Sequence, residues 1–104
     1  MTLQEFETKL KAAVPESYRD AAPSGKTRFA VWHSYGGRSI FGNDRTQMVI
    51  PKVQIDILTQ EYADIFVDDV CAALWSMGIA YDVISESYDP DYAAIRTILQ
   101  MVVV

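Results

Sequence analysis

The amino-acid sequence predicts an α+β domain, with a mostly antiparallel β-sheet and two main helices packed on one face. Apolar residues alternate along 53–57 and then recur every three or four positions along 61–77, which are the periods of a strand and of an amphipathic helix. A second helix pattern lies at the N-terminus, and two strand-like segments meet at a turn near the C-terminus. The 104 residues suit a single domain with the order α-β-β-α-β-β.

The first helix is predicted over residues 1–14. Thr2 and Glu5 have the spacing of a capping box, in which each side chain accepts a hydrogen bond from the other residue's backbone amide. Pro15 should end the helix, since proline cannot continue one. Residues 15–27 contain prolines and a glycine and are expected to form a linking loop.

Residues 28–58 are predicted to form two strands separated by a long loop at 35–46. β-Branched and aromatic residues dominate the two flanking segments, whereas glycine, asparagine and aspartate favour turns in the middle. The alternation of apolar residues changes phase near Pro51. One extra residue near Pro51-Lys52, as in a β-bulge, would restore a single apolar face. Pro51 has no amide donor, which places this part of the strand at an edge or at the bulge.

The second helix is expected over residues 61–77, with Thr59 as its N-terminal cap and Gly78 closing its last turn in a left-handed conformation. Residues 79–104 then alternate loosely on both sides of an Asp-Pro-Asp turn at 89–91. This pattern predicts an antiparallel C-terminal hairpin.

The charge of the chain is distributed unevenly. The net charge is −5, which argues against a nucleic-acid-binding protein because such proteins normally carry a basic field. Residues 1–18 carry a net charge of −1, residues 19–52 carry +4 and residues 53–104 carry −8. Opposed charges of this kind could attract copies of the chain head to tail, although solvated surface charge would give the same pattern.

Half of the residues are hydrophobic, which is a high share for a small monomer. Either the core is dense, or a second apolar surface is buried against other subunits. Cys71 is the only cysteine, so an internal disulfide is excluded and a small buried side chain is expected. No apolar run approaches the roughly 18 residues that a membrane-spanning helix needs, so no membrane association is expected.

The residue types needed for catalysis do not form a recognisable pattern, so we expect no enzyme, no catalytic residue, no metal site and no cofactor. His33 is the only histidine, and with Cys71 it supplies too few ligands for a zinc site. The sequence Gly36-Gly37-Arg38 lacks the ending of a phosphate-binding loop. His33 is therefore interpreted as structural, and a small enzyme that uses it remains the third hypothesis.

Several short strings together resemble a known family. Residues 40–45 read Ile-Phe-Gly-Asn-Asp-Arg, and residues 53–59 lead into the acidic amphipathic helix. Residues 78–81 read Gly-Ile-Ala-Tyr and precede a tyrosine-containing hairpin and a closing apolar strand. Over residues 28–104 this order resembles the small tail-completion proteins, or tail terminators, of long-tailed bacteriophages and prophages.

The resemblance implies a structural protein that assembles, usually as a homohexameric ring, at the head-proximal end of the tail tube. Such a ring stops tube polymerisation and joins the head. Its partners would be further copies of itself, the tail-tube protein and a head-completion or connector protein, while DNA passes through without specific binding. The expected location is the virion tail or neck, and the host cytoplasm during assembly. The alternatives are a head-side completion protein of similar fold and a non-catalytic interaction module outside phages.

The predicted loop at 35–46 is the candidate interaction site. It is basic, contains glycines and could reach over a neighbouring subunit or toward the lumen of a ring. The residues predicted to lie at a subunit interface or at the lumen are Arg38, Phe41, Asn43, Asp44 and Arg45.

Overall fold

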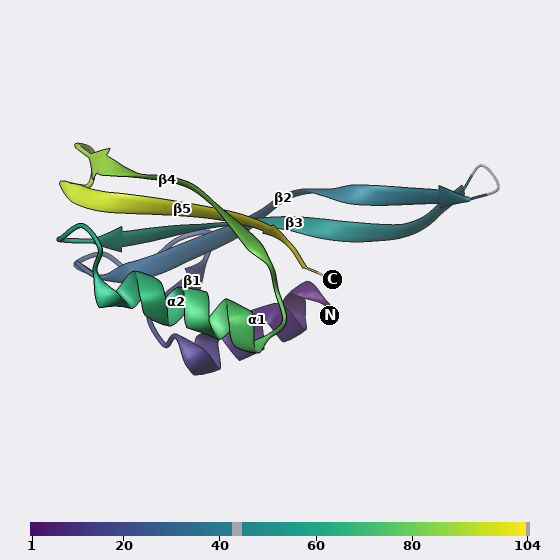
Figure 1. Ribbon diagram of the computed structural model, residues 1–104, viewed down its shortest axis with the longest axis horizontal. Coiled ribbons are helices and arrows are strands. Elements are labelled where there is room, and N and C mark those ends of the chain that lie inside the picture. The colour runs from purple at the N-terminus through teal and green to yellow at the C-terminus, as the bar shows by residue number, and fades with distance from the viewer. Residues whose placement is uncertain (43–44, 104) are drawn as a thin grey trace.

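A computed structural model describes residues 1–42 and 45–103 and shows an α+β fold, as predicted (Figure 1). Its five-stranded sheet has the order β1-β2-β3-β5-β4, in which β1 and β2 are parallel and all other neighbours are antiparallel. The elements are α1 (Leu3–Ala13), β1 (Ser17–Arg19), β2 (Phe29–Gly42), β3 (Arg45–Thr59), α2 (Ile65–Ser76), β4 (Tyr81–Asp89) and β5 (Ala94–Val102).

The predicted capping box of the first helix is confirmed. The Glu5 amide donates to Thr2 Oγ1 at 3.1 Å, and the Thr2 amide donates to Glu5 Oε1 at 3.3 Å. Two otherwise unpaired donors of the first turn are thereby satisfied. The helix ends at Ala13, two residues before Pro15. Its buried side of Phe6 and Leu10 packs against the sheet.

The second helix begins at Ile65 rather than at Glu61, and its cap is Asp64, so the prediction of Thr59 as the cap is wrong. The Asp64 carboxylate accepts the Phe66 amide at 2.8 Å. Thr59 is the last residue of β3, is 1% exposed, and donates its hydroxyl to the Glu61 carbonyl at 2.8 Å. The strand therefore continues through the position that the sequence pattern assigned to the cap.

The second helix ends as expected. Gly78 lies directly after the C-cap and has φ of +73°, a left-handed conformation that glycine adopts without steric cost. Cys71 lies on this helix and is partly buried against the core. Neither α1 nor α2 is long and apolar enough to cross a membrane, and they are the helices of the described part of the chain.

The long loop predicted at 35–46 is wrong. β2 and β3 continue through it as one antiparallel hairpin, whose pairs run on from Gly37↔Pro51 to Gly42↔Arg45 (Figure 1). The turn residues counted as a loop are spread along strands, where backbone pairing does not depend on side-chain type. Asn43 and Asp44 separate the two strands and lie outside the described residues.

A bulge is present near Pro51-Lys52, as predicted, but its extra residue lies on the neighbouring strand β2 and not on β3. Ser34 pairs with Val53 and Gly37 pairs with Pro51, so β2 places two residues, Tyr35 and Gly36, opposite Lys52. Gly36 has φ of +121°, which side chains disfavour, and this explains why the extra residue is accommodated there.

Pro51 lies where the neighbouring strand β5 ends. Its carbonyl accepts the Val103 amide at 2.9 Å, so this residue faces the β5 side of β3. Its missing amide leaves only the last bond of this ladder unmade, because β5 ends at Val102. The change of apolar phase near Pro51 therefore coincides with the end of pairing to β5 and not with an extra residue of β3 at this point.

Both helices cover the same face of the sheet and bury its core (Figure 1). Trp32 on β2 is 1% exposed, and its ring meets Phe6 of α1 edge to face with centroids 5.0 Å apart. The core residues of β3, β5 and α2 that pack with them are Val53, Ile55, Ile57, Leu99, Met101, Val70, Ala73 and Leu74. The predicted C-terminal hairpin is confirmed as β4 and β5.

One strand was missed. Residues 15–27, predicted as a loop, contain β1, which pairs in parallel with β2 through Ser17↔Ala30 and Arg19↔Trp32. Its three residues are too few to show a period in the sequence. The segment that follows β1 turns at Asp20, with φ of +67°, and crosses the sheet face opposite the helices, where Phe29, Leu58 and Ala94 form a small second cluster.

Candidate interaction surfaces

The two central strands extend beyond the rest of the sheet and form what we call the arm, residues 35–42 of β2 and 45–51 of β3 (Figure 1). β1 pairs with β2 as far as Trp32, and β5 pairs with β3 as far as Lys52. Beyond these points the strands pair with each other. The arm accounts for the elongated shape of 50 × 26 × 23 Å.

The arm holds the residues that the sequence singled out as an interface. Arg38 and Phe41 are in its β2 strand, and Arg45 begins its β3 strand. Asn43 and Asp44 lie outside the described residues. The structure thus brings three of the five candidates onto one projecting element, which is a ribbon and not a loop. The basic segment 19–52 includes this element.

A second surface lies at the opposite end of the sheet order, on β4. Val83, Ile84 and Tyr88 are 61%, 51% and 55% exposed, which is unusual for apolar side chains that have a sheet to pack on. Asp82 and Glu86 are exposed between them. β4 is the outermost strand, so its apolar side chains lie beyond the area that α1 and α2 cover.

Helix α2 adds exposed apolar side chains at its two ends. Trp75 is 81% exposed and Ile65 is 65% exposed, while Tyr62 just before the helix is 57% exposed. The acidic residues Asp68 and Asp69 lie exposed between them. Large exposed apolar groups rimmed by charge are typical of protein interaction surfaces.

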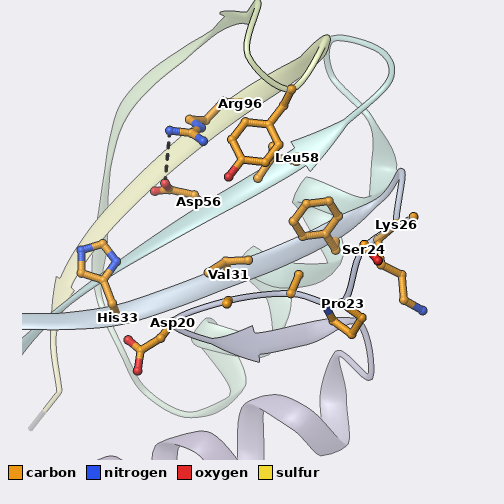
Figure 2. A pocket seen from close by; sticks show the side chains of 14 residues that line it. Asp20, Pro23, Ser24, Lys26, Val31, His33, Asp56, Leu58 and Arg96 are labelled. Carbon is orange, nitrogen blue, oxygen red and sulfur yellow. Dashed lines mark ion pairs between the residues drawn. The ribbon is translucent and has the colours of Figure 1, made fainter.

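A cavity of about 410 Å³ lies on the sheet face away from the helices (Figure 2). Residues 20–26 form one wall, β2 and β3 form its floor, and Tyr92 and Arg96 close the other side. Figure 2 shows His33 at one end of this cavity and the Asp56–Arg96 ion pair at its far wall.

Arg96 forms ion pairs with two acidic side chains beside this cavity. Arg96 is 3.6 Å from a carboxylate oxygen of Asp56 and 3.2 Å from one of Asp89, and its guanidinium lies 5.1 Å from the centre of the Tyr92 ring. Asp56 also accepts a hydrogen bond from Gln54 Nε2 at 2.8 Å. This network holds the β4–β5 turn against the sheet, which is a structural task.

His33 lies beside the aromatic ring of Tyr35. Its ring lies 6.0 Å from that of Tyr35, centre to centre, at 59°. Residues 1–42 and 45–103 contain no group of three or more histidine, cysteine, aspartate or glutamate side chains arranged to hold a metal ion.

No protein-family model matches this chain, and no curated protein matches it either. The functional argument therefore rests on the fold and on its exposed surfaces. The sequence pattern did not indicate the exposed apolar residues of β4 or the exposure of Trp75. The alternation of residues within β4 predicts a strand. Its position at the edge of the sheet depends on the strand order, which a local sequence pattern does not reveal.

Proposed function

We propose that the protein is a structural tail-completion protein, a tail terminator, of a long-tailed bacteriophage or prophage. It would assemble as a ring, expected to be a homohexamer, at the head-proximal end of the tail tube, stop polymerisation there and join the head. The observation that carries the proposal is the arm, because a two-stranded ribbon that projects from a small sheet has little to pack against within its own chain.

Exposed apolar groups support an assembling protein. An isolated hairpin is at best marginally stable in water, so a long one gains from contact with another surface. β4 and α2 offer such surfaces, with Val83 and Trp75 among the most exposed apolar side chains. Contacts between different faces of identical subunits generate a ring when the rotation per subunit closes.

The acidic character of the chain supports a role around DNA without binding it. A net charge of −5 repels phosphate, so DNA can slide past such a protein without being held. The expected partners are further copies of the chain, the tail-tube protein, and a head-completion or connector protein. No enzymatic activity, metal or cofactor is part of this proposal.

Tail tubes polymerised in vitro provide the test. Purified tail-tube protein from the same phage is assembled with and without this protein, and tube ends and lengths are measured by negative-stain electron microscopy. We expect a ring-shaped density at one end of each tube and no further growth from that end. Tubes that bind no protein at either end, and that lengthen equally with and without it, would overturn the proposal. Binding to purified connectors but not to tubes would instead indicate the head-side completion protein.

A further inference from the structure

Two open strand edges lie on opposite sides of the sheet, in addition to the three-residue edge of β1 and the β3 edge of the arm, where pairing with β5 has ended. One is the outer edge of β4, the last strand of the sheet. The other is the outer edge of β2 beyond Trp32, where its pairing with β1 ends. An open edge presents a row of backbone donors and acceptors that can template another strand.

The backbone groups on the β2 edge can be assigned. The Ala30 amide donates to the Glu16 carbonyl at 2.9 Å, and the Trp32 carbonyl accepts the Asp20 amide at 2.8 Å. Backbone groups alternate in direction along a strand, so every second residue points its N–H and C=O to the same side. Ser34 therefore points its N–H and C=O to the same outer side as Ala30 and Trp32, beyond the last residue that β1 pairs with. The chain turns away at Asp20, and β2 continues past it as far as Gly42.

The groups on the β4 edge follow from the same alternation. The bond from the Val103 amide to the Pro51 carbonyl, at 2.9 Å, directs the odd-numbered residues of β5 toward β3. The even-numbered residues of β5 therefore face β4, where Arg96 is opposite Ser87. Glu86 and Tyr88, on either side of Ser87, consequently direct their backbone groups outward.

We propose that β4 of one copy pairs with the outer edge of β2 in the arm of the next copy, so that the sheets of neighbouring subunits join. The inference rests on the self-assembly that the proposed function requires. The strand that pairs with the β4 edge is then supplied by a second copy of this chain. Because the two edges are different surfaces, the contact is heterologous and each subunit retains one free edge of each kind for its next neighbour.

The charge and length of β4 and of the open part of β2 favour pairing between two copies of the chain. β4 carries three acidic residues and no basic one over nine residues, Tyr81–Asp89. The open part of β2, residues 33–42, carries Arg38 and no acidic residue, and it matches β4 closely in length. Opposite charges across a strand pair stabilise it, whereas two β4 edges brought together would place like charges opposite each other.

The apolar side chains along β4 favour the same arrangement. Val83, Ile84 and Tyr88 lose contact with water when another strand is added beside them. Natural sheets usually protect an open edge with lysine or proline, and β4 contains neither. Its bulge at Ile84 leaves a regular stretch at 85–89 for pairing.

Proline substitutions test the pairing directly. Glu86→Pro removes an outward amide and should leave β4 paired to β5, whereas Glu86→Ala removes the same side chain and keeps the amide. We expect Glu86→Ala to self-associate nearly as the wild type does, and Glu86→Pro to self-associate at least about tenfold more weakly in sedimentation velocity, with an unchanged circular dichroism spectrum. Equal association of the two variants would overturn the inference, as would a wild-type protein that remains monomeric at high concentration.

Hydrogen exchange supplies a readout that needs no substitution. On raising the wild-type concentration into the associating range, the amides of Ser34, Glu86 and Tyr88 should exchange at least about tenfold more slowly, while those of the buried residues Phe6 and Leu10 in α1 serve as an internal reference. Unchanged exchange at these three amides in the associated protein would contradict strand pairing. If these amides are protected but the protein does not cap tail tubes, only the proposed function is contradicted. If the protein caps tubes but these amides are not protected, only the strand-pairing inference is contradicted.

Discussion

The covered part of the sheet and the arm are built from the same two strands, yet their surroundings differ completely. Trp32 on β2 and Ile55 on β3 pair with each other and are 1% and 0% exposed beneath the helices. From Arg38 and Ile50 to the tip of the hairpin, the strand pairs recorded for the described residues are between these two strands. One half of the hairpin therefore contributes to the buried core, and the other half is the part for which we propose a partner.

The residues that stabilise the fold and the residues that we propose for self-association therefore lie in different parts of the chain. Buried apolar area drives folding of the covered half, because each large side chain removed from water contributes roughly 1.5–3 kcal/mol. The arm adds strand pairs that extend away from the part of the sheet covered by the helices (Figure 1). Substitutions in the two regions should consequently affect different measurements.

The largest expected effect comes from the two tryptophans, Trp32 and Trp75, which are the only ones in the chain. Trp32→Ala removes a ring that is 1% exposed and packed on Phe6, and should lower the free energy of unfolding by about 3–5 kcal/mol. Trp75→Ala removes a ring that is 81% exposed and should change it by less than about 0.5 kcal/mol. Urea denaturation of both variants measures the difference, and equal losses would show that burial does not separate the two sites.

Local sequence pattern predicted the covered half well. Capping at Thr2 and Glu5, the left-handed Gly78 and the C-terminal hairpin were all correct, because each depends on residues close together in the chain. The prediction of a strand at 53–57 with one buried face was also correct, because apolar residues that alternate along a strand point to the same side of the sheet.

The arm was not predictable in the same way. Gly36, Gly37 and Gly42 were interpreted as loop residues, although they lie in a paired strand. Pairing between two ribbon strands is set by register, and the backbone bonds that form it are indifferent to side-chain type. Likewise Thr59 was assigned to a helix cap that Asp64 provides, because both residue types cap helices and only the length of β3 decides between them.

A charge reversal in the arm tests whether its basic residues contribute to assembly. Arg38→Glu combined with Arg45→Glu should weaken self-association by about tenfold or more, because opposite-charge contacts with acidic surfaces become repulsive. The free energy of unfolding should change little, since both residues lie beyond the helix-covered core. Lys9→Glu combined with Lys11→Glu on α1 makes the same change in net charge elsewhere and is the control. Sedimentation at several salt concentrations measures the effect, and equal weakening by both pairs would attribute it to net charge alone.

The smallest expected effect lies at the cap of α2, in the covered half. The Phe66 amide, and after it the Arg28 guanidinium at 2.6 Å, hold the pKa of Asp64 below its ordinary value. A lowered pKa in the folded state means that the ionised carboxylate stabilises the fold above the ordinary pKa, and that this contribution is lost as the pH falls through the lowered value. Asp64→Ala should therefore cost about 1 kcal/mol at neutral pH and much less at about pH 2.

Asp64→Asn separates the cap from the charge at this site. Asparagine caps helices about as well as aspartate, so this variant should retain most of the stability at neutral pH while losing the pH dependence that Asp64 contributes. Asp69→Asn, at an exposed position within the same helix, makes the same change in charge away from the cap. Urea denaturation of the three variants across this pH range measures the effect. If Asp69→Asn altered the pH dependence as much as Asp64→Asn did, the contribution would belong to the helix charge as a whole and not to the cap.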